Sequence, residues 1–225
     1  MPRTFLSYVV RGRIERRTVY GRDVMRKKSH ISLAMYLVRE LKLEGLNKHK
    51  KAFCLGAILP DLTPKMITSP HEFETSYENM KDFVRNIFAE NADSEWKERV
   101  LWRRIGVALH YMADYFTFPH NTSFSGSLKD HCMYESEMKY YLRDFVYTPE
   151  AGRIFCEARR MAAGIGSLEA LFSFVKKRHR AYMQAPHSVE RDCYEIVMLC
   201  SIAFVVMAEL ACAQNLVAEP VYRCA

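Results

Sequence analysis

The feature that most constrains the fold is an almost wholly apolar segment of eighteen residues, IVMLCSIAFVVMAELACA, at Ile196–Ala213. This length is at the short limit for a membrane-spanning helix, and the carboxylate of Glu209 within it would be costly in lipid. We therefore expect a helix that is buried in a protein core. The rest of the chain has no alternating apolar and polar pattern long enough to predict a strand.

Apolar residues at helical spacing predict about eight helices along the chain. Ser29 is expected to cap the first helix and Gly45 to end it. Thr75 and Glu78 fit a capping box at the start of a later helix. Pro119 is expected to end the helix that contains GVALHYMADYF. The predicted fold class is all-α, a single-domain multi-helix bundle.

The positive charge of the chain is concentrated at its N-terminus. Residues 1–28 contain nine Lys and Arg and two acidic residues, whereas residues 29–225 contain 24 of each sign. We therefore divide the chain into a basic arm, 1–28, and a helical domain, 29–225. Such an arm is solvated, or it binds nucleic acid or an anionic membrane. Met25 opens MRKKSHISLAMYLVREL and is a second candidate for the true start, which would place most of the arm upstream of it.

The cysteines favour a reducing compartment. The chain has seven, an odd number, and none of them forms a CxxC pair. The apolar run FLSYVV near the N-terminus is only six residues long and is followed at once by RGR, so it does not form a secretory signal. We expect a cytoplasmic protein.

A regular series of histidines and acids runs through the helix before Pro119 and into the next helix. His110 is followed by Asp114 four residues later, and His131 by Glu135 four residues later, with His120 between the two pairs. Residues four apart share one face of a helix. Each pair is therefore expected to point in one direction.

Further candidate ligands lie upstream. Asp61 and His71 are in or beside a proline-rich loop, and His30 opens the first predicted helix. The other histidines lie in basic or loop surroundings and are expected at the surface: His49, His179 and His187.

A single histidine or aspartate on an apolar helix face is usually a hydrogen-bonded structural group. The series is harder to explain in this way, because Asp114 lies in the otherwise apolar LHYMADYF and a buried carboxylate needs a partner or a metal. Imidazole and carboxylate ligands in sets of three or four suit zinc. The sequence therefore predicts a site for several metal ions.

This order-specific series resembles the zinc-dependent phospholipase C family and, more distantly, the fungal zinc nucleases that share its fold. The resemblance covers roughly residues 29–140 by motif. Glu135 at the final position is similar to the phospholipase branch, since the nucleases tend to carry aspartate there.

The resemblance implies a ligand set for each of two to three zinc ions. One ion would be held by Asp61, His71, His110 and Asp114. A second would be held by His120, His131 and Glu135. A third would be held by His30 and by Asp114 as a bridge.

The chain departs from the family pattern at the third ion. In the family this ion also takes the amino group and carbonyl of the mature N-terminal residue, commonly a tryptophan, and no tryptophan precedes His30 here. The third zinc is then absent, weak, or completed by an internal group. Leu62 follows Asp61 where an aromatic hydroxyl would favour a choline head group, so the head-group preference stays open.

The resemblance implies a zinc-dependent phosphodiesterase that hydrolyses a phospholipid or related phosphodiester by metal-activated water. Asp61 would act as the general base or would orient the nucleophile. Two alternatives are a nuclease-like zinc phosphodiesterase and a catalytically degenerate zinc-binding member. The neutral charge of residues 29–225 makes a nucleic-acid substrate the weaker alternative. Peripheral contact with a membrane would use the loops at 62–75 and 121–128, where Phe124 is the aromatic residue, or the basic arm.

Overall fold

The computed structural model describes residues 14–62, 71–89 and 95–217, and these residues form eight α-helices and one 3-10 helix without a strand. The predicted all-α class is confirmed. The elements, in chain order, are α1 (Ile14–Leu41), α2 (Glu44–Ile58), α4 (Phe73–Ala89), α5 (Glu95–Asp114), η1 (Phe118–His120), α6 (Leu128–Phe145), α7 (Pro149–Ala162), α8 (Leu168–Met183) and α9 (Val189–Ala213).

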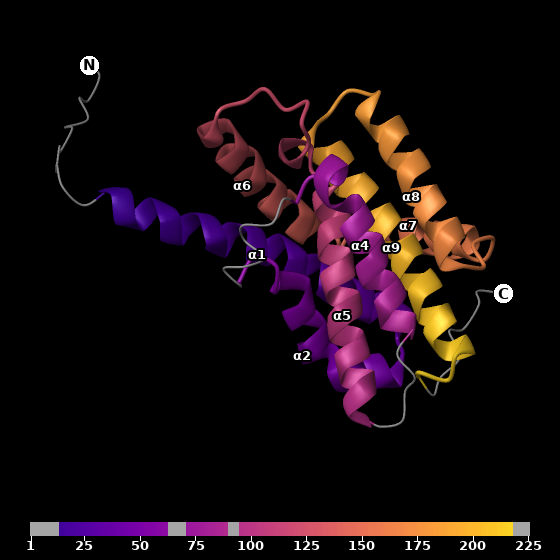
Figure 1. The fold of residues 1–225 in the computed structure, drawn as a ribbon. Coiled ribbons are helices and arrows are strands. Elements are labelled where there is room, and N and C mark those ends of the chain that lie inside the picture. The colour runs from indigo at the N-terminus through magenta and orange to yellow at the C-terminus, as the bar shows by residue number, and fades with distance from the viewer. Residues whose placement is uncertain (1–13, 63–70, 90–94, 218–225) are drawn as a thin grey trace, which may run out of the picture.

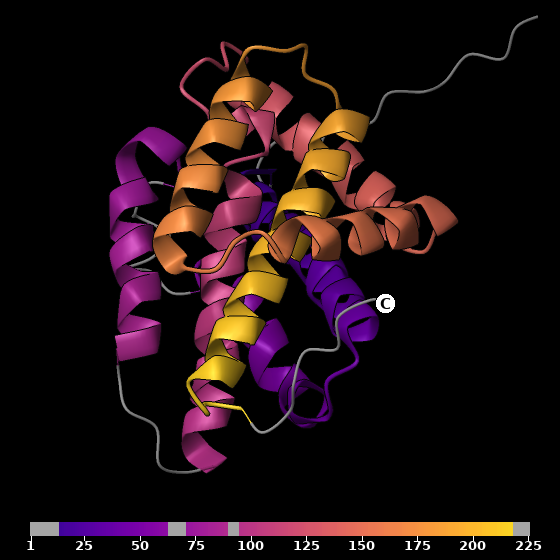
Figure 2. The same cartoon turned by 90° about the vertical axis from the view of Figure 1, so that its right-hand side faces the viewer.

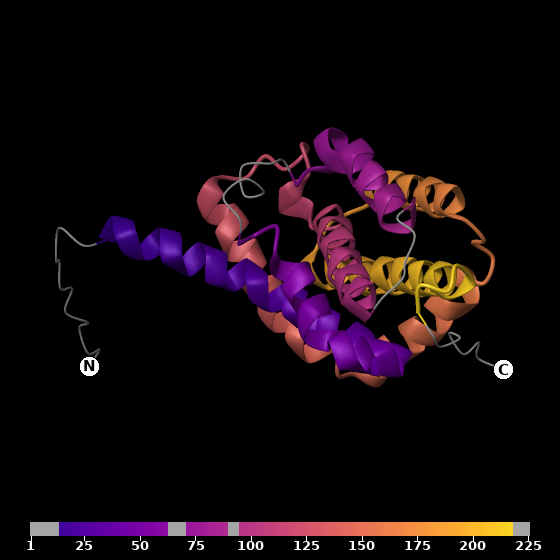
Figure 3. The same cartoon turned by 60° about the horizontal axis from the view of Figure 1, so that its bottom comes forward.

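Helices α5 and α9 form the centre of the bundle. They contact each other, α9 also contacts α1, α6, α7 and α8, and α5 also contacts α1, α2 and α4. Figure 2 shows α9 running along the bundle beside α8. The end view in Figure 3 shows α5 and α9 side by side, with α4 and α8 on one side and α1 and α2 on the other. The first part of α1 extends away from the bundle (Figure 1).

Helix α9 contains the apolar segment that the sequence singles out. It is long and apolar enough to cross a membrane by length and composition, but 78% of its most apolar window is buried within the chain. Its buried side chains include Phe204, which stacks on Phe53 of α2 with ring centroids 5.0 Å apart. The prediction of a core helix is therefore confirmed.

Helices α2 and α5 approach so closely that their backbones touch. A Cβ atom at Gly56 would overlap the carbonyl oxygen of Arg103, and a Cβ at Gly106 would overlap that of Phe53. Only glycine fits at these two positions. The close contact holds the end of α2, which leads to Asp61, against the α5 turn that precedes His110.

Several predicted helix boundaries are wrong. Helix α1 starts at Ile14, so Ser29 lies inside it, and it ends near Lys42, which takes up a positive φ of 56°. Gly45 lies in the first turn of α2 instead of ending α1. Helix α4 starts at Phe73, so Thr75 is within it, and the Thr75 hydroxyl donates to the carbonyl of Glu72.

The long central helix also ends earlier than the position of proline suggests. α5 stops at Asp114, and Pro119 lies in the following 3-10 helix, whose backbone turns are closed by bonds such as His120 N to Thr117 O at 2.9 Å. This turn redirects the chain so that His120 is not on the α5 axis.

Replacing Gly106 by alanine should destabilise the protein by about 1–3 kcal/mol, because the new methyl group meets backbone that cannot rotate away. The matched control is Gly152→Ala in α7, where a Cβ would meet nothing within 4 Å. That variant should gain about 0.5–1 kcal/mol from helix propensity. Urea unfolding of both variants measures the difference, and equal stabilities would contradict the close contact.

Candidate metal centre

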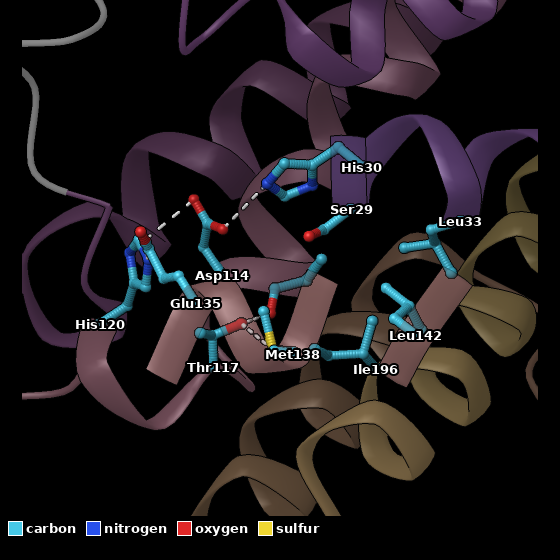
Figure 4. A pocket seen from close by; sticks show the side chains of 11 residues that line it. Ser29, His30, Leu33, Asp114, Thr117, His120, Glu135, Met138, Leu142 and Ile196 are labelled. Atoms are coloured by element: carbon cyan, nitrogen blue, oxygen red, sulfur yellow. Dashed lines mark hydrogen bonds and ion pairs between the residues drawn. The ribbon is translucent and has the colours of Figure 1, made fainter. Parts of the chain in front are cut away.

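The last turn of α5 supplies the residue around which the candidate site is arranged. Asp114 is 4% exposed and its carboxylate faces four imidazoles. Figure 4 shows it between His30 and His120, with dashed lines to both. The nitrogen–oxygen distances are 2.8 Å to His71 Nδ1, 3.2 Å to His110 Nε2, 3.3 Å to His30 Nε2 and 4.0 Å to His120 Nδ1.

The segments that flank α2 and α4 add two further groups. Asp61 follows α2 in a turn closed by its own N–H, which donates to the Ile58 carbonyl at 3.2 Å. Its Oδ1 lies 3.9 Å from His110 Nε2, and its Oδ2 is buried with no hydrogen-bond partner. His71 lies just before α4, and its Nδ1 is 3.4 Å from Nε2 of His110.

A second set of groups is formed by η1 and the first two turns of α6. Glu135 Oε1 lies 3.1 Å from His120 Nε2 and 2.9 Å from His131 Nε2. The start of α6 is fixed by a capping box in which Ser127 accepts from the N–H of Asp130 and Asp130 accepts from that of Ser127. This cap sets the rotation of the helix and therefore the direction of His131.

The backbone selects the tautomer of His110. Its Nδ1 lies 2.9 Å from the carbonyl oxygen of Ala57, an acceptor only, so Nδ1 carries the proton and donates. The unprotonated Nε2 then points at Asp114 and Asp61. Such outer contacts fix the ring orientation of metal-binding histidines.

Burial and charge act against each other at the centre of the site. Burial raises the pKa of Asp114, but the facing His120, His110 and His30 hold it well below its usual range. Burial and the neighbouring His30 lower the pKa of His110. Burial also lowers the pKa of His30, but Asp114 opposes this and the net effect is a raised pKa. An ionised Asp114 and a neutral His110 are the forms that bind cations.

The donor groups fit a metal centre. Three sets of ligand atoms each lie within 4.8 Å of one another: His30, His110 and Asp114; Asp61, His71 and His110; and His120, His131 and Glu135. All are imidazole nitrogens and carboxylate oxygens, which zinc accepts. The buried and unpaired Oδ2 of Asp61 is an atom that such an ion would satisfy. All eight residues predicted from the sequence are therefore brought together in one region, while their individual roles stay predictions.

Comparison with known proteins decides the family. The family model described as zinc dependent phospholipase C matches residues 29–189. The chain belongs to this family. The family is all-α, in agreement with the fold, and it supports zinc as the metal for the His and Asp groups. Neither curated proteins nor solved structures gave a match.

The family assignment draws attention to the surroundings of His30, where the resemblance implies a third ion with an N-terminal amino group as ligand. Here the chain passes through this point as one continuous helix, α1. Ser29, 6% exposed, and Thr117 are the hydroxyl groups lining a pocket beside His30 and Asp114. The pocket is small, with a volume of about 20 Å³, and its other wall is apolar (Figure 4).

Sequence reasoning missed the residues that hold the turn after α5. Asn121 donates its amide to the carbonyls of Tyr115, at 3.3 Å, and Thr117, at 3.0 Å, both in the segment between α5 and η1. Its Oδ1 lies 2.9 Å from Nε2 of His179 in α8. The His179 ring also stacks on Phe73, with centroids 3.8 Å apart. His179 therefore links the segments that carry His120 and His71.

The expectation of surface positions for the remaining histidines is wrong. His179 is buried between Phe73 and Phe116. His49 is also buried, and its Nε2 lies 3.7 Å from Glu98 Oε2. His187 is half-buried and stacks on Phe118 at 3.9 Å. Their basic and loop surroundings in the sequence give no signal of these contacts.

Acidification should destabilise the metal-free protein through His179. Burial lowers its pKa from 6.5 to about 4, so the unfolded chain binds a proton more readily between these values. The stability that is complete above pH 6.5 is lost as the pH falls toward 4, by about 2–3 kcal/mol. Urea unfolding near neutral and near pH 5 measures this loss in the wild type. His179→Gln, which keeps a donor for Asn121, should show a smaller loss, and an equal loss would contradict the assignment.

Proposed function

We propose that the protein is a zinc-dependent phosphodiesterase that hydrolyses a phospholipid or a related phosphodiester. The observation that carries this proposal is the arrangement of two complete three-ligand groups around the shared carboxylate of Asp114. Two cations held by these residues would supply neutralisation of the anionic phosphodiester oxygens and activation of water.

The tautomer of His110 leaves one ring nitrogen free to bind a metal, and this favours two ions with three protein ligands each. Its Nδ1 is occupied by the Ala57 carbonyl, so only Nε2 remains and His110 serves one ion. Asp61 and His71 complete the group that includes His110, and His120, His131 and Glu135 form the other. His30 and Asp114 are then left for a third ion, and we propose that it binds more weakly than the other two.

Asp61 is the proposed residue for proton transfer. Its Oδ1 faces His110 while its Oδ2 is buried and has no hydrogen-bond partner. One oxygen of this carboxylate would bind the ion, and the other would then accept a proton from the attacking water or orient that water. Asp114 differs, because its oxygens contact several imidazoles.

We further propose that the face formed by α1 and α2 contacts an anionic membrane. Ile31 and Met35 of α1 are 38% and 42% exposed, and Leu55 of α2 is 41% exposed. The two helices adjoin here, since Cys54 Sγ lies 3.6 Å from Met35 Sδ. The exposed Lys51 lies one helical turn from Leu55. Apolar side chains with neighbouring lysines suit an anionic interface.

The loop at 121–128 suits membrane contact less well than this face. Phe124 of the 121–128 loop is half-buried and packs against Phe118 and His131, with ring centroids 5.5 and 6.1 Å away. It is therefore part of the wall around the site. Most of the 62–75 loop and part of the basic arm lie outside the described residues.

A cytoplasmic location is also proposed. Among the described residues the six cysteines are free, and Cys193 and Cys200 are buried in the core. Free core thiols suit a reducing compartment. Fractionation of cells that produce the tagged protein tests the location.

Asp114→Asn should lower the zinc content and abolish hydrolysis together. The substitution removes the charge that four imidazoles face, and loss of metal stabilisation worth several kcal/mol lowers turnover by about 100-fold or more. Asp144→Asn on the exposed face of α6 is the control and should change neither quantity. Elemental analysis gives zinc per chain, and release of a phosphorylated head group from phosphatidylcholine in mixed micelles gives activity.

Other outcomes of the same assay would replace the proposed activity. Cleavage of single-stranded DNA without release of a head group would favour the nuclease-like alternative. Two zinc ions per chain, with no DNA cleavage and no head-group release from phosphatidylcholine, phosphatidylethanolamine or phosphatidylserine, would favour a zinc-binding member that has lost catalysis. If no zinc is bound after expression with added zinc, the proposed zinc binding itself is wrong.

Membrane contact predicts that Met35→Glu weakens co-sedimentation with vesicles of phosphatidylserine and phosphatidylcholine. An added carboxylate in the interface is repelled by anionic lipid and costs desolvation, so binding should fall several-fold. Met133→Glu is the matched control, because Met133 is 60% exposed on α6. Equal binding of both variants, or a loss confined to the control, would contradict the α1 and α2 face.

A further inference from the structure

A buried carboxylate lies behind the metal centre and belongs to none of the candidate ligand groups. Asp192 is in the first turn of α9 and is fully buried, with 0% of its surface exposed. Burial raises its pKa to about 6, while three hydrogen bonds favour the ionised form. The positive end of the α9 dipole favours the same form.

The donors to Asp192 come from three different elements. Its Oδ2 accepts from the backbone N–H of Phe118 at 2.8 Å and from the Tyr134 hydroxyl at 2.8 Å. Its Oδ1 accepts from the Tyr182 hydroxyl at 2.8 Å. Every donor is an N–H or O–H group, so the carboxylate acts as the acceptor in all three bonds.

Two of these donors lie beside metal-ligand candidates. Phe118 is the first residue of η1, and His120 is the last. Tyr134 precedes Glu135 in α6 and lies one turn after His131. A single oxygen atom of Asp192 therefore joins the two backbone segments that supply His120, His131 and Glu135.

The third donor has a different place in the fold. Tyr182 is in the last turn of α8, which carries none of the eight candidate ligands. Its bond to Oδ1 links α8 to α9 and reaches no ligand-bearing element. Tyr134 and Tyr182 thus make chemically equal hydrogen bonds to one carboxylate, and only one of them is on a ligand-bearing element.

We propose that Asp192 is a positioning residue that sets the separation of η1 and α6 and thereby the geometry of the ion held by His120, His131 and Glu135. The inference rests on the proposed metal binding. Metal–ligand distances tolerate errors of only about 0.2 Å, so a shift of η1 relative to α6 weakens this ion first. Asp61, His71 and His110 are not joined to Asp192, so the other ion is unaffected.

The paired variants Tyr134→Phe and Tyr182→Phe test this inference. Each removes one hydroxyl from the same carboxylate. Zinc-free protein is titrated with cobalt(II) alone, whose visible absorption reports coordination, and His131→Ala identifies the signal of the second ion. Tyr134→Phe should lower the affinity for that ion by about 10–100-fold, as loss of outer contacts does at other metal sites. The affinity for the ion held by Asp61, His71 and His110 should not change. Tyr182→Phe should leave both unchanged.

Thermal unfolding of the metal-free variants separates positioning from general stability. Similar destabilisation of both variants with unchanged cobalt affinity would show a purely structural Asp192 and overturn the inference. Equal loss of both cobalt ions in Tyr134→Phe would overturn it as well. A wild type that binds no cobalt contradicts the proposed function instead. Asp192→Asn should resemble Tyr134→Phe, and the tyrosine pair decides the question if that variant does not fold.

Discussion

The structure depends on the burial of the carboxylate of Asp114 at the point where several parts of the helix bundle meet. An ionised group removed from water needs partners that restore its hydration energy. The partners come from α1, from α5 itself, from the segment before α4 and from η1, so four parts of the chain must meet at this point. Helix packing brings these parts together around the carboxylate.

The site combines rigid and irregular segments. His30, His110 and Glu135 are on long helices whose positions follow from core packing, whereas Asp61, His71 and His120 are on turns at helix ends. Turns need their own constraints, and the structure supplies them through backbone hydrogen bonds and through α8 and α9. This distribution of ligands between helices and turns is typical of functional sites, in which loops carry reactive groups on a rigid scaffold.

The all-α class and the pairs His110–Asp114 and His131–Glu135 could be predicted because they depend on local spacing, whereas the ligand sets that add His30, Asp61 and His71 rest on the family resemblance. Pairs four residues apart share a helix face, and apolar periodicity marks helices wherever they lie. The roles of His179 and Asp192 include hydrogen bonds between distant parts of the chain, since His179 and Asn121 are 58 positions apart and so are Asp192 and Tyr134. Helix ends were also missed, since Lys42 takes up a positive φ where Gly45 was the expected stop.

The distant position of Asp192 has a consequence for the order in which the protein matures. The candidate ligands all lie between residues 30 and 135, and the carboxylate that joins η1 to α6 follows them along the chain. Chains emerge from the ribosome N-terminus first. The nascent chain therefore exposes all of its candidate ligands before the Asp192 carboxylate is available to join η1 to α6. On the proposed role of Asp192, the ion held by His120, His131 and Glu135 would acquire its final geometry only after α9 has docked.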